Sequence, residues 1–328
     1  MDTGKIYDDA LRLWVSAPQG DLTNKYCQGG ESGDGNLLLP GDNLSMMAAL
    51  SRQIGAGARA PVSLVYMDPP YFSNRNPESR VLVKTPGGDS YVKAPAFSDK
   101  WAGSGKAGSW SESMAGYLSM LVPRIIAARD ILAEDGALWL HLDRRAVHYA
   151  KVMADIVFGD PESLINEVVW FYKSGGSSTK RFSNKHDTLL FYAKNKKKYK
   201  FFPQEEKSYN RGLKPYRFKG VKEYRDEYGW YTVVNMKDVW EIPMVGRTAA
   251  ERTGYATQKP EALIERIVLS CTNEGDTCLD PFGGSGTLAA VCGKHNRKWV
   301  SIDESPAAIR TAADRLGLSQ SASSFARS

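Results

Sequence analysis

The chain of 328 residues contains few cysteines and no long hydrophobic run. Its four cysteines, Cys27, Cys271, Cys278 and Cys292, show no CxxC spacing, and with four scattered histidines they give no framework for a metal site. Free thiols in a reducing cytoplasm are therefore expected rather than disulfides. No apolar stretch approaches the roughly 20 residues that a bilayer-spanning helix needs, so no membrane partner is predicted.

A secretion signal is also missing from the N-terminal segment. Residues 1–20 carry Asp2, Asp8 and Asp9 and lack a basic stretch followed by an apolar one. The chain is 42% hydrophobic, which is enough for one α/β core with a smaller inserted or appended region. These features predict a soluble, cytoplasmic protein.

Positive charge is concentrated in one segment. Between Phe171 and Trp230 there are 16 Lys or Arg against 6 Asp or Glu, whereas the whole chain has 43 against 37, so the rest is net negative. The same segment holds 14 aromatic residues. Basic residues interleaved with aromatic ones suit a nucleic acid, because basic side chains neutralise phosphates and aromatic rings stack on bases. A solvated lysine-rich region remains the alternative, above all for residues 194–200.

The most informative motif is Asp68-Pro69-Pro70-Tyr71, which ends an apolar run at 62–67 that is predicted to be a strand. The aspartate offers a hydrogen-bond acceptor, the prolines remove backbone donors and fix φ, and the tyrosine ring can stack on a planar substrate. Taken alone, the motif could also be a stop signal for the strand. A second motif decides between these interpretations.

That second motif is a glycine-rich turn. Residues 277–280 predict a short strand, Gly284 and Gly286 let the backbone approach a ligand, and a helix follows. A further strand at 299–303 ends in Asp303, which can accept hydrogen bonds from ribose hydroxyls, and a helix is expected at 306–316. A nicotinamide or flavin site shares this fingerprint, but it gives no reason for the Asp68 motif. No Gly-Lys-Ser/Thr follows, which argues against a phosphate loop.

In this order, the two motifs resemble those of S-adenosylmethionine-dependent DNA amino-methyltransferases of the permuted β group, in which the catalytic quartet precedes the cofactor turn. The resemblance runs from about residue 36 to 316. It implies a Rossmann-like methyltransferase fold, with a mostly parallel twisted sheet, helices on both faces and a small basic target-recognition region. Further matching stretches are Gly41-Asp42-Asn43-Leu44, Trp170-Phe171-Tyr172, Asn184-Lys185-His186-Asp187 and residues 257–266.

The resemblance also implies roles for individual residues. Asp68 and the carbonyl of Pro69 would hold an exocyclic amine, with Pro70 beside them and Tyr71 stacked on the base. Asp42 would lie near the adenine of the cofactor, and Lys259 beside its methionine carboxylate, although a plain surface role stays open for both. The residues implied at the cofactor are Asp42, Lys259, Asp280, Phe282, Gly284, Gly286, Thr287 and Asp303.

The expected organisation has four parts. Residues 1–172 form the catalytic half, with a flexible loop at 72–112, and residues 173–256 form the target-recognition region. Residues 257–316 form the cofactor half, and 317–328 a flexible tail. The apolar spacing at 113–134 predicts a helix with a kink or break at Pro123. The basic residues predicted to contact DNA are Lys173, Lys180, Arg181, Lys185, Arg211 and Arg217.

Within this scheme His141, in a buried strand at 137–143, and His148 are expected to be structural or exposed rather than catalytic. The predicted function is transfer of a methyl group from S-adenosylmethionine to N6 of an adenine flipped out of double-stranded DNA. An N4-cytosine methyltransferase is the alternative, because adenine is favoured only by the aspartate in first place of the quartet. A catalytically silent nucleic-acid-binding protein is an alternative of another class. A separate-chain restriction endonuclease and a second copy of the chain are the further predicted partners, and no metal is expected.

Overall fold

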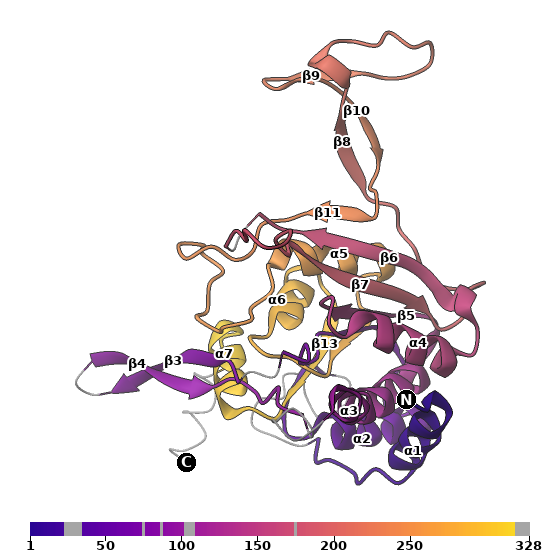
Figure 1. Cartoon of the computed structure of the whole chain (residues 1–328), viewed down its shortest axis with the longest axis vertical. Coiled ribbons are helices and arrows are strands. Elements are labelled where there is room, and N and C mark those ends of the chain that lie inside the picture. Colours follow the sequence, from indigo (N-terminus) through magenta and orange to yellow (C-terminus); the bar gives the residue numbers. More distant parts are fainter. Residues whose placement is uncertain (23–34, 74–75, 86–87, 102–108, 174–175, 319–328) are drawn as a thin grey trace.

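The computed structural model describes residues 1–22, 35–73, 76–85, 88–101, 109–173 and 176–318. Within these ranges, eight strands form one sheet in the order β1-β13-β12-β2-β5-β7-β6-β11 (Figure 1). Strand β7 is antiparallel to β5 and β6, and the other pairs are parallel. The strands are β1 (Leu37–Pro40), β2 (Val62–Met67), β5 (Leu132–Leu142), β6 (Leu164–Phe171), β7 (His186–Ala193), β11 (Val239–Glu241), β12 (Thr277–Asp280) and β13 (Lys298–Asp303).

Helices cover both faces of this sheet, as the sequence predicted. One apolar core lies under α1 to α4 and a second under α5 to α7 (Figure 1). All residues of β2 and β12 are buried, which explains their continuous apolar runs, since a parallel strand between two helical layers has no solvent face. The helices are α1 (Thr3–Val15), α2 (Asn43–Gly55), α3 (Trp110–Ile131), α4 (Val147–Phe158), α5 (Glu261–Cys271), α6 (Thr287–Lys294) and α7 (Pro306–Arg315).

Helix α3 differs from its predicted form. It begins at Trp110, where Ser109 and Glu112 form a capping box, and continues through Pro123 without a break. The expected break is therefore wrong. The residues beside the proline, among them Val122 and Ile125, are fully buried, so packing outweighs the hydrogen bond that the proline cannot make.

The loop expected at 72–112 is partly ordered. Strands β3 (Glu78–Thr85) and β4 (Gly88–Pro95) pair as an antiparallel hairpin that extends from the body, and β3 contacts α7 (Figure 1). Residues 74–75, 86–87 and 102–108 lie outside the described ranges. The loop predicted at 72–112 therefore contains a paired hairpin at 78–85 and 88–95, which the sequence did not indicate because cross-strand backbone pairing leaves little trace in apolar periodicity.

The predicted target-recognition region at 173–256 contains two strands of the central sheet as well as a separate small sheet. Its strands β7 and β11 belong to the central sheet. A separate three-stranded sheet of β8 (Glu205–Tyr209), β10 (Gly229–Asn235) and β9 (Tyr224–Asp226) projects from the body (Figure 1). Residues 205–235 are called the arm below. Most of the expected tail, 319–328, lies outside the described residues, and Leu318 is buried.

Three smaller features complete the description. Short 3-10 turns occupy Pro161–Ser163 and Arg211–Leu213. Cys271, Cys278 and Cys292 are buried free thiols, while Cys27 lies outside the described residues. Within the described ranges no helix is both long and apolar enough to cross a bilayer.

Gly283 provides a test of the packing between the glycine turn and β13. A Cβ atom there would lie 2.1 Å from Oγ of Ser301, a buried hydroxyl without a hydrogen-bond partner among the described atoms. We expect Gly283→Ala to lower the free energy of unfolding by about 1 to 3 kcal/mol, because the new methyl group must displace the buried Ser301 hydroxyl or shift the turn. The double variant Gly283→Ala/Ser301→Ala should regain most of this loss in denaturant titrations. An equal loss in the single and double variants would contradict the contact.

Candidate active site

The parallel pairing places several strand ends at one edge of the sheet. Asp68 directly follows β2, Asp280 is the last residue of β12, and Asp303 is the last of β13. Adjacent to this edge is a cavity of about 600 Å³, whose lining includes both sequence motifs. Parallel sheets bind ligands outside the carboxyl ends of their strands, so this cavity is the candidate active site.

The Asp68 motif forms one wall of the cavity. Asp68, Pro69, Pro70 and Tyr71 all line it, and the Tyr71 hydroxyl donates to Oδ1 of Asp68 at 2.6 Å. The pKa of Tyr71 is raised well above its usual value, first by burial and then by the negative charge of Asp68. The next residue, Phe72, has φ +57°, which is unusual for a bulky residue and turns the chain sharply after Tyr71.

Lys259 reaches the same wall from the segment before α5. Its Nζ forms an ion pair with Oδ2 of Asp68 and lies 5.0 Å from the centroid of the Tyr71 ring. The side chains of Lys259 and Asp68 are only 11% and 16% exposed. The sequence placed Lys259 beside the methionine end of the cofactor but gave no sign that it would contact Asp68.

A buried polar group lies behind Asp68. His141 on β5 is fully buried, with Nδ1 at 2.8 Å from the Tyr66 hydroxyl and 4.0 Å from Oδ1 of Asp68, while Nε2 is 3.5 Å from Oδ2 of Asp187. Burial would raise the pKa of Asp187, but the nearby His141 ring, Lys259 and the Tyr172 hydroxyl bring it below its usual value. His141 does not line the cavity, and His148 is exposed. The sequence did not predict that His141 lies between Asp68 and Asp187, because the three residues are far apart along the chain.

The glycine turn forms another part of the cavity wall. Gly284 has φ +51° and Gly286 has φ +72°, so both adopt the left-handed conformation that favours glycine. The Gly284 N–H donates to Oδ2 of Asp303 at 2.9 Å, and the Ser305 N–H donates to its Oδ1 at 2.8 Å. A Cβ at Gly284 would lie 3.2 Å from the ring of Tyr255, so the absent side chain keeps this wall open.

Two of the predicted cofactor residues do not line the cavity. Asp42 caps α2 by accepting from the Ser45 N–H at 2.8 Å, and it pairs with Arg124 at 3.0 Å. Gly286 caps α6, where a Cβ would meet Ala312 at 3.0 Å, so its role is close helix packing. The predicted residues that do line the cavity are Lys259, Asp280, Phe282, Gly284, Thr287 and Asp303.

Several residues that line the cavity were not predicted from the sequence. Asn43 and Arg124 line the cavity beside Asp42, and the Asn43 amide donates to the Pro281 carbonyl at 2.7 Å. Tyr255, from the segment before α5, is 6% exposed and faces the glycine turn. No sequence signal marked Tyr255 or Arg124, whereas Asn43 lies within a stretch that matched the family.

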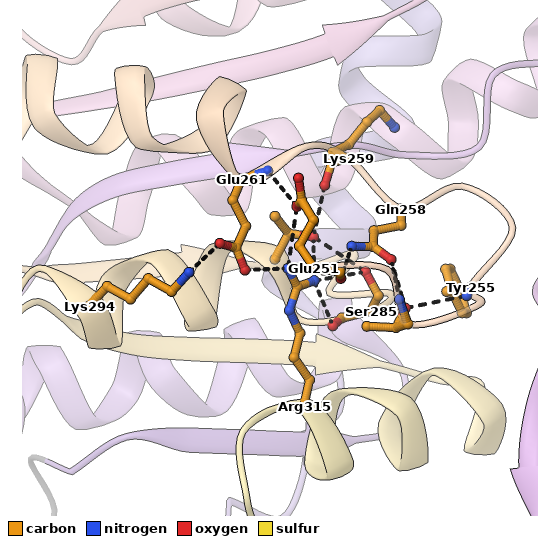
Figure 2. A network of polar contacts seen from close by, with 10 residues as sticks. Glu251, Tyr255, Gln258, Lys259, Glu261, Ser285, Lys294 and Arg315 are labelled. Carbon is orange, nitrogen blue, oxygen red and sulfur yellow. Dashed lines mark hydrogen bonds and ion pairs between the residues drawn. The ribbon is translucent and has the colours of Figure 1, made fainter. Parts of the chain in front are cut away.

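A polar network fixes the segment that carries Tyr255 and Lys259 (Figure 2). The Arg315 guanidinium of α7, 8% exposed, donates to Oε1 of Glu261 at 2.7 Å and to Oγ1 of Thr287 at 3.0 Å. The Gln258 amide donates to the Glu251 carbonyl at 2.7 Å. The network thereby clamps this segment onto α6 and α7, next to the glycine turn.

The cavity fits an adenosyl cofactor by the chemistry of its donors. Asp303 offers a carboxylate at the end of a strand, Phe282 and Tyr255 offer apolar faces, and the missing Gly284 side chain leaves room for close approach. Burial raises the pKa of Asp303 to about 6, partly offset by the Ser305 and Gly284 N–H donors. Burial also raises the pKa of Asp280 well above its usual value. Among the residues described, no group of three or more His, Cys, Asp or Glu could hold a metal ion.

The predicted DNA contacts fall into three places. Lys173 pairs with Glu241, and the Lys185 ammonium donates to the Gly176 carbonyl at 3.1 Å. Lys180 and Arg181 are exposed on the connection between β6 and β7, next to Phe182, which is 98% exposed. Strand β7 is antiparallel to both β5 and β6, so β6 runs in the same direction as β5 and β2. The connection that follows β6 therefore begins at the sheet edge where the cavity lies. Arg211 and Arg217 are exposed on the arm.

The lysine-rich stretch 194–200 is largely neutralised in the fold. Lys196 pairs with Asp160 at 2.7 Å, and Lys200 pairs with Asp276 at 2.9 Å and Asp135 at 3.3 Å. These acids lie elsewhere in the chain. Part of the positive excess counted along the sequence is therefore balanced by acids of the body.

Fold and site together define an α/β protein with a ligand cavity at the carboxyl edge of a mostly parallel sheet. The family model described as DNA methylase matches residues 62–314, so the chain belongs to the DNA methylase family. The type II methyltransferase M.HpaI of Haemophilus parainfluenzae is 37% identical over 150 residues, which is 45% of this chain but only 44% of M.HpaI.

Two further comparisons cover more of the chain. DNA adenine methyltransferase YhdJ of Escherichia coli K12 is 26% identical over 261 residues, covering 78% of this chain and 76% of YhdJ. The structure of the PvuII DNA methyltransferase, which is cytosine-N4-specific, superposes with a TM-score of 0.55 at 14% identity, covering 90% of this chain and 93% of that one. The structural likeness supports the methyltransferase fold.

The raised pKa of Asp303 predicts a dependence of stability on pH. Its folded pKa of about 6 exceeds the ordinary value of 3.8, so its stabilising contribution is complete below pH 3.8 and is lost as pH rises through 6. Two pKa units correspond to about 3 kcal/mol. Relative to Asp303→Asn, which does not titrate, the native chain should lose about this much unfolding free energy between pH 4 and 7.5. A difference independent of pH would contradict the assignment.

Proposed function

We propose that the chain is a DNA methyltransferase that uses S-adenosylmethionine to methylate N6 of adenine in double-stranded DNA. The observation that carries the proposal is one cavity in which a carboxylate and a stacking ring, Asp68 and Tyr71, face the glycine turn and Asp303. A base amine and an adenosyl methyl donor can meet there. Membership of the DNA methylase family supports the same conclusion.

The chemistry requires help from the protein, because the lone pair of an aromatic amine is delocalised into its ring. Asp68 and the Pro69 carbonyl accept the two amino hydrogens, which favours a pyramidal nitrogen with an available lone pair. Tyr71 stacks on the base and fixes its plane. The nitrogen lone pair would then be directed at the methyl group that the cofactor supplies, and Asp68 would pass the extra amine proton to solvent. Positioning alone can supply roughly 7 to 11 kcal/mol.

The bound cofactor supplies a methyl group activated by a positively charged sulfur. Asp303 would accept hydrogen bonds from the ribose hydroxyls, and Phe282 and Tyr255 would enclose the adenine. Asp280 and Thr287 line the space between the two motifs. Lys259 would meet the methionine carboxylate.

Adenine is favoured over cytosine for two reasons. The quartet begins with aspartate, and YhdJ, similar over 78% of the chain, is named an adenine methyltransferase. The cytosine-N4-specific PvuII enzyme shares the fold at 14% identity, which carries no argument about the base. Both amines are chemically alike, so the N4-cytosine alternative is decided by identifying the product. A silent nucleic-acid-binding protein would need no intact Asp68, Tyr71 and glycine turn.

The target base must leave the duplex, at a cost of a few kcal/mol that phosphate contacts and stacking offset. The connection at 176–185 and the arm are the surfaces we assign to DNA, because both expose cationic and aromatic side chains. A DNA substrate also supports the cytoplasmic location. A separate-chain restriction endonuclease and a second copy of the chain remain partners predicted from the sequence alone.

Replacing the catalytic carboxylate tests the chemistry. Asp68→Ala should lower kcat by at least about 100-fold, because the amine loses its acceptor, while cofactor binding is retained. Methyl transfer to bulk genomic DNA and cofactor binding by calorimetry measure the two effects. Asp8→Ala, an exposed aspartate on α1, is the control and should behave as the native chain. Loss of cofactor binding in a folded Asp68→Ala variant would oppose the assignment.

Removing cations from the edge beside the cavity tests the DNA surface. Lys180→Ala/Arg181→Ala should flatten the slope of log affinity against log salt by about 2, since each lost phosphate contact removes about 0.9. The matched control is Lys197→Ala/Lys198→Ala, two exposed lysines that follow β7 at the opposite edge of the sheet. Binding to nonspecific duplex DNA suffices as the measurement. Equal changes in the two variants would refute the assigned surface.

A further inference from the structure

Both oxygens of the Asp68 carboxylate already have donors. Oδ1 accepts from the Tyr71 hydroxyl at 2.6 Å, and Oδ2 is paired with the Lys259 ammonium. The ammonium also lies 5.0 Å from the centroid of the Tyr71 ring, where a base would stack. In this arrangement Lys259 occupies the place of the target amine, as a donor to Asp68 beside the stacking face.

Each carboxylate oxygen can accept a second hydrogen bond, but the Lys259 ammonium lies at the face of the Tyr71 ring where a base would stack, so the base amine needs the place of a present donor. The Tyr71 ring has to stay for stacking, and its hydroxyl moves with the ring. Lys259 carries a point charge on a flexible four-carbon stem, so its ammonium can move without the backbone. It is the donor that can leave.

The backbone of Lys259 is fixed while its ammonium end is directed elsewhere. The Lys259 carbonyl accepts from Oγ1 of Thr287 at 3.4 Å, and Thr287 is held in turn by Arg315 at 3.0 Å. Figure 2 shows this carbonyl directed toward the network and the ammonium end pointing away from it. A swing of the side chain would leave the clamped segment in place.

The ammonium needs another anion, because an unpaired buried charge is costly. Asp280 and Asp303 line the cavity, but burial raises the pKa of both carboxyl groups, which weakens them as partners. The α-carboxylate of the cofactor would bring a fresh anion into the same cavity.

We propose that Lys259 is a positioning residue that switches partners: it holds Asp68 in the free enzyme and moves to the carboxylate of the cofactor when the cofactor binds. Asp68 then becomes available to the base amine only in the cofactor complex. This inference rests on the proposed function. Because coupling is reciprocal, the grip of Asp68 on Lys259 must also weaken cofactor binding.

Calorimetry with two ligands tests the switch without DNA. S-adenosylhomocysteine carries the α-carboxylate, whereas 5′-methylthioadenosine has the adenosyl group without it. Asp68→Asn should raise the affinity for S-adenosylhomocysteine by about 5-fold or more, because Lys259 is released, and leave that for methylthioadenosine unchanged. Lys259→Met should lower the affinity for S-adenosylhomocysteine and leave that for methylthioadenosine unchanged. In the double variant, Asp68→Asn should have no further effect.

Two controls separate the switch from general electrostatics and from misfolding. Glu304→Gln removes another negative charge from the cavity lining, and its effect should be the same with lysine or methionine at position 259. Lys259→Arg keeps the charge and shows whether position 259 tolerates replacement, with circular dichroism as the folding check.

The outcomes are distinct. An Asp68→Asn variant whose affinity for S-adenosylhomocysteine is unchanged or lower, or changes equally for both ligands, would overturn the switch while leaving the methyltransferase proposal intact. A folded native chain that binds neither ligand would overturn the proposed function, and the switch with it.

Discussion

The parallel pairing of β12 with both β2 and β13 is the constraint on which the site depends. Its register sets Leu279 opposite Val65 and Asp280 opposite Ser301, so the three strands end at one edge. Asp68 and Asp303 are separated by more than two hundred residues of sequence, yet this pairing brings both to one cavity. The order of the two motifs along the chain has no effect on that geometry, because only the strand order in the sheet matters.

The cavity brings together acidic side chains whose burial the fold compensates only in part. Asp280 and Asp303 are buried carboxyl groups whose pKa values are raised, while Asp68 is held by Lys259. Such an arrangement lowers stability and leaves acceptors ready for donors that a ligand brings. Ribose hydroxyls and a base amine are donors of this kind, which connects the electrostatic cost of the fold with its function.

The sequence predicted the parts of the site that are local in the chain. The Asp68 quartet and the glycine turn are contiguous, and the burial of β2 and β12 explains why their apolar runs were recognisable. Contacts between distant segments could not be predicted: His141 with Asp187, Tyr255 at Gly284, and the acids that neutralise Lys196 and Lys200. Their partners are set by the topology of the sheet. The β3–β4 hairpin was missed because backbone pairing needs no apolar pattern.

The most direct measurement identifies the product. The purified chain is incubated with S-adenosylmethionine and methyl-free duplex DNA, and the DNA is digested to nucleosides for mass spectrometry. The account predicts N6-methyldeoxyadenosine, formed by the native chain and absent with Asp68→Ala. N4-methyldeoxycytidine would contradict the assignment of the base, and the absence of any methylated nucleoside across diverse DNA, with cofactor bound, would contradict the assignment as a DNA methyltransferase.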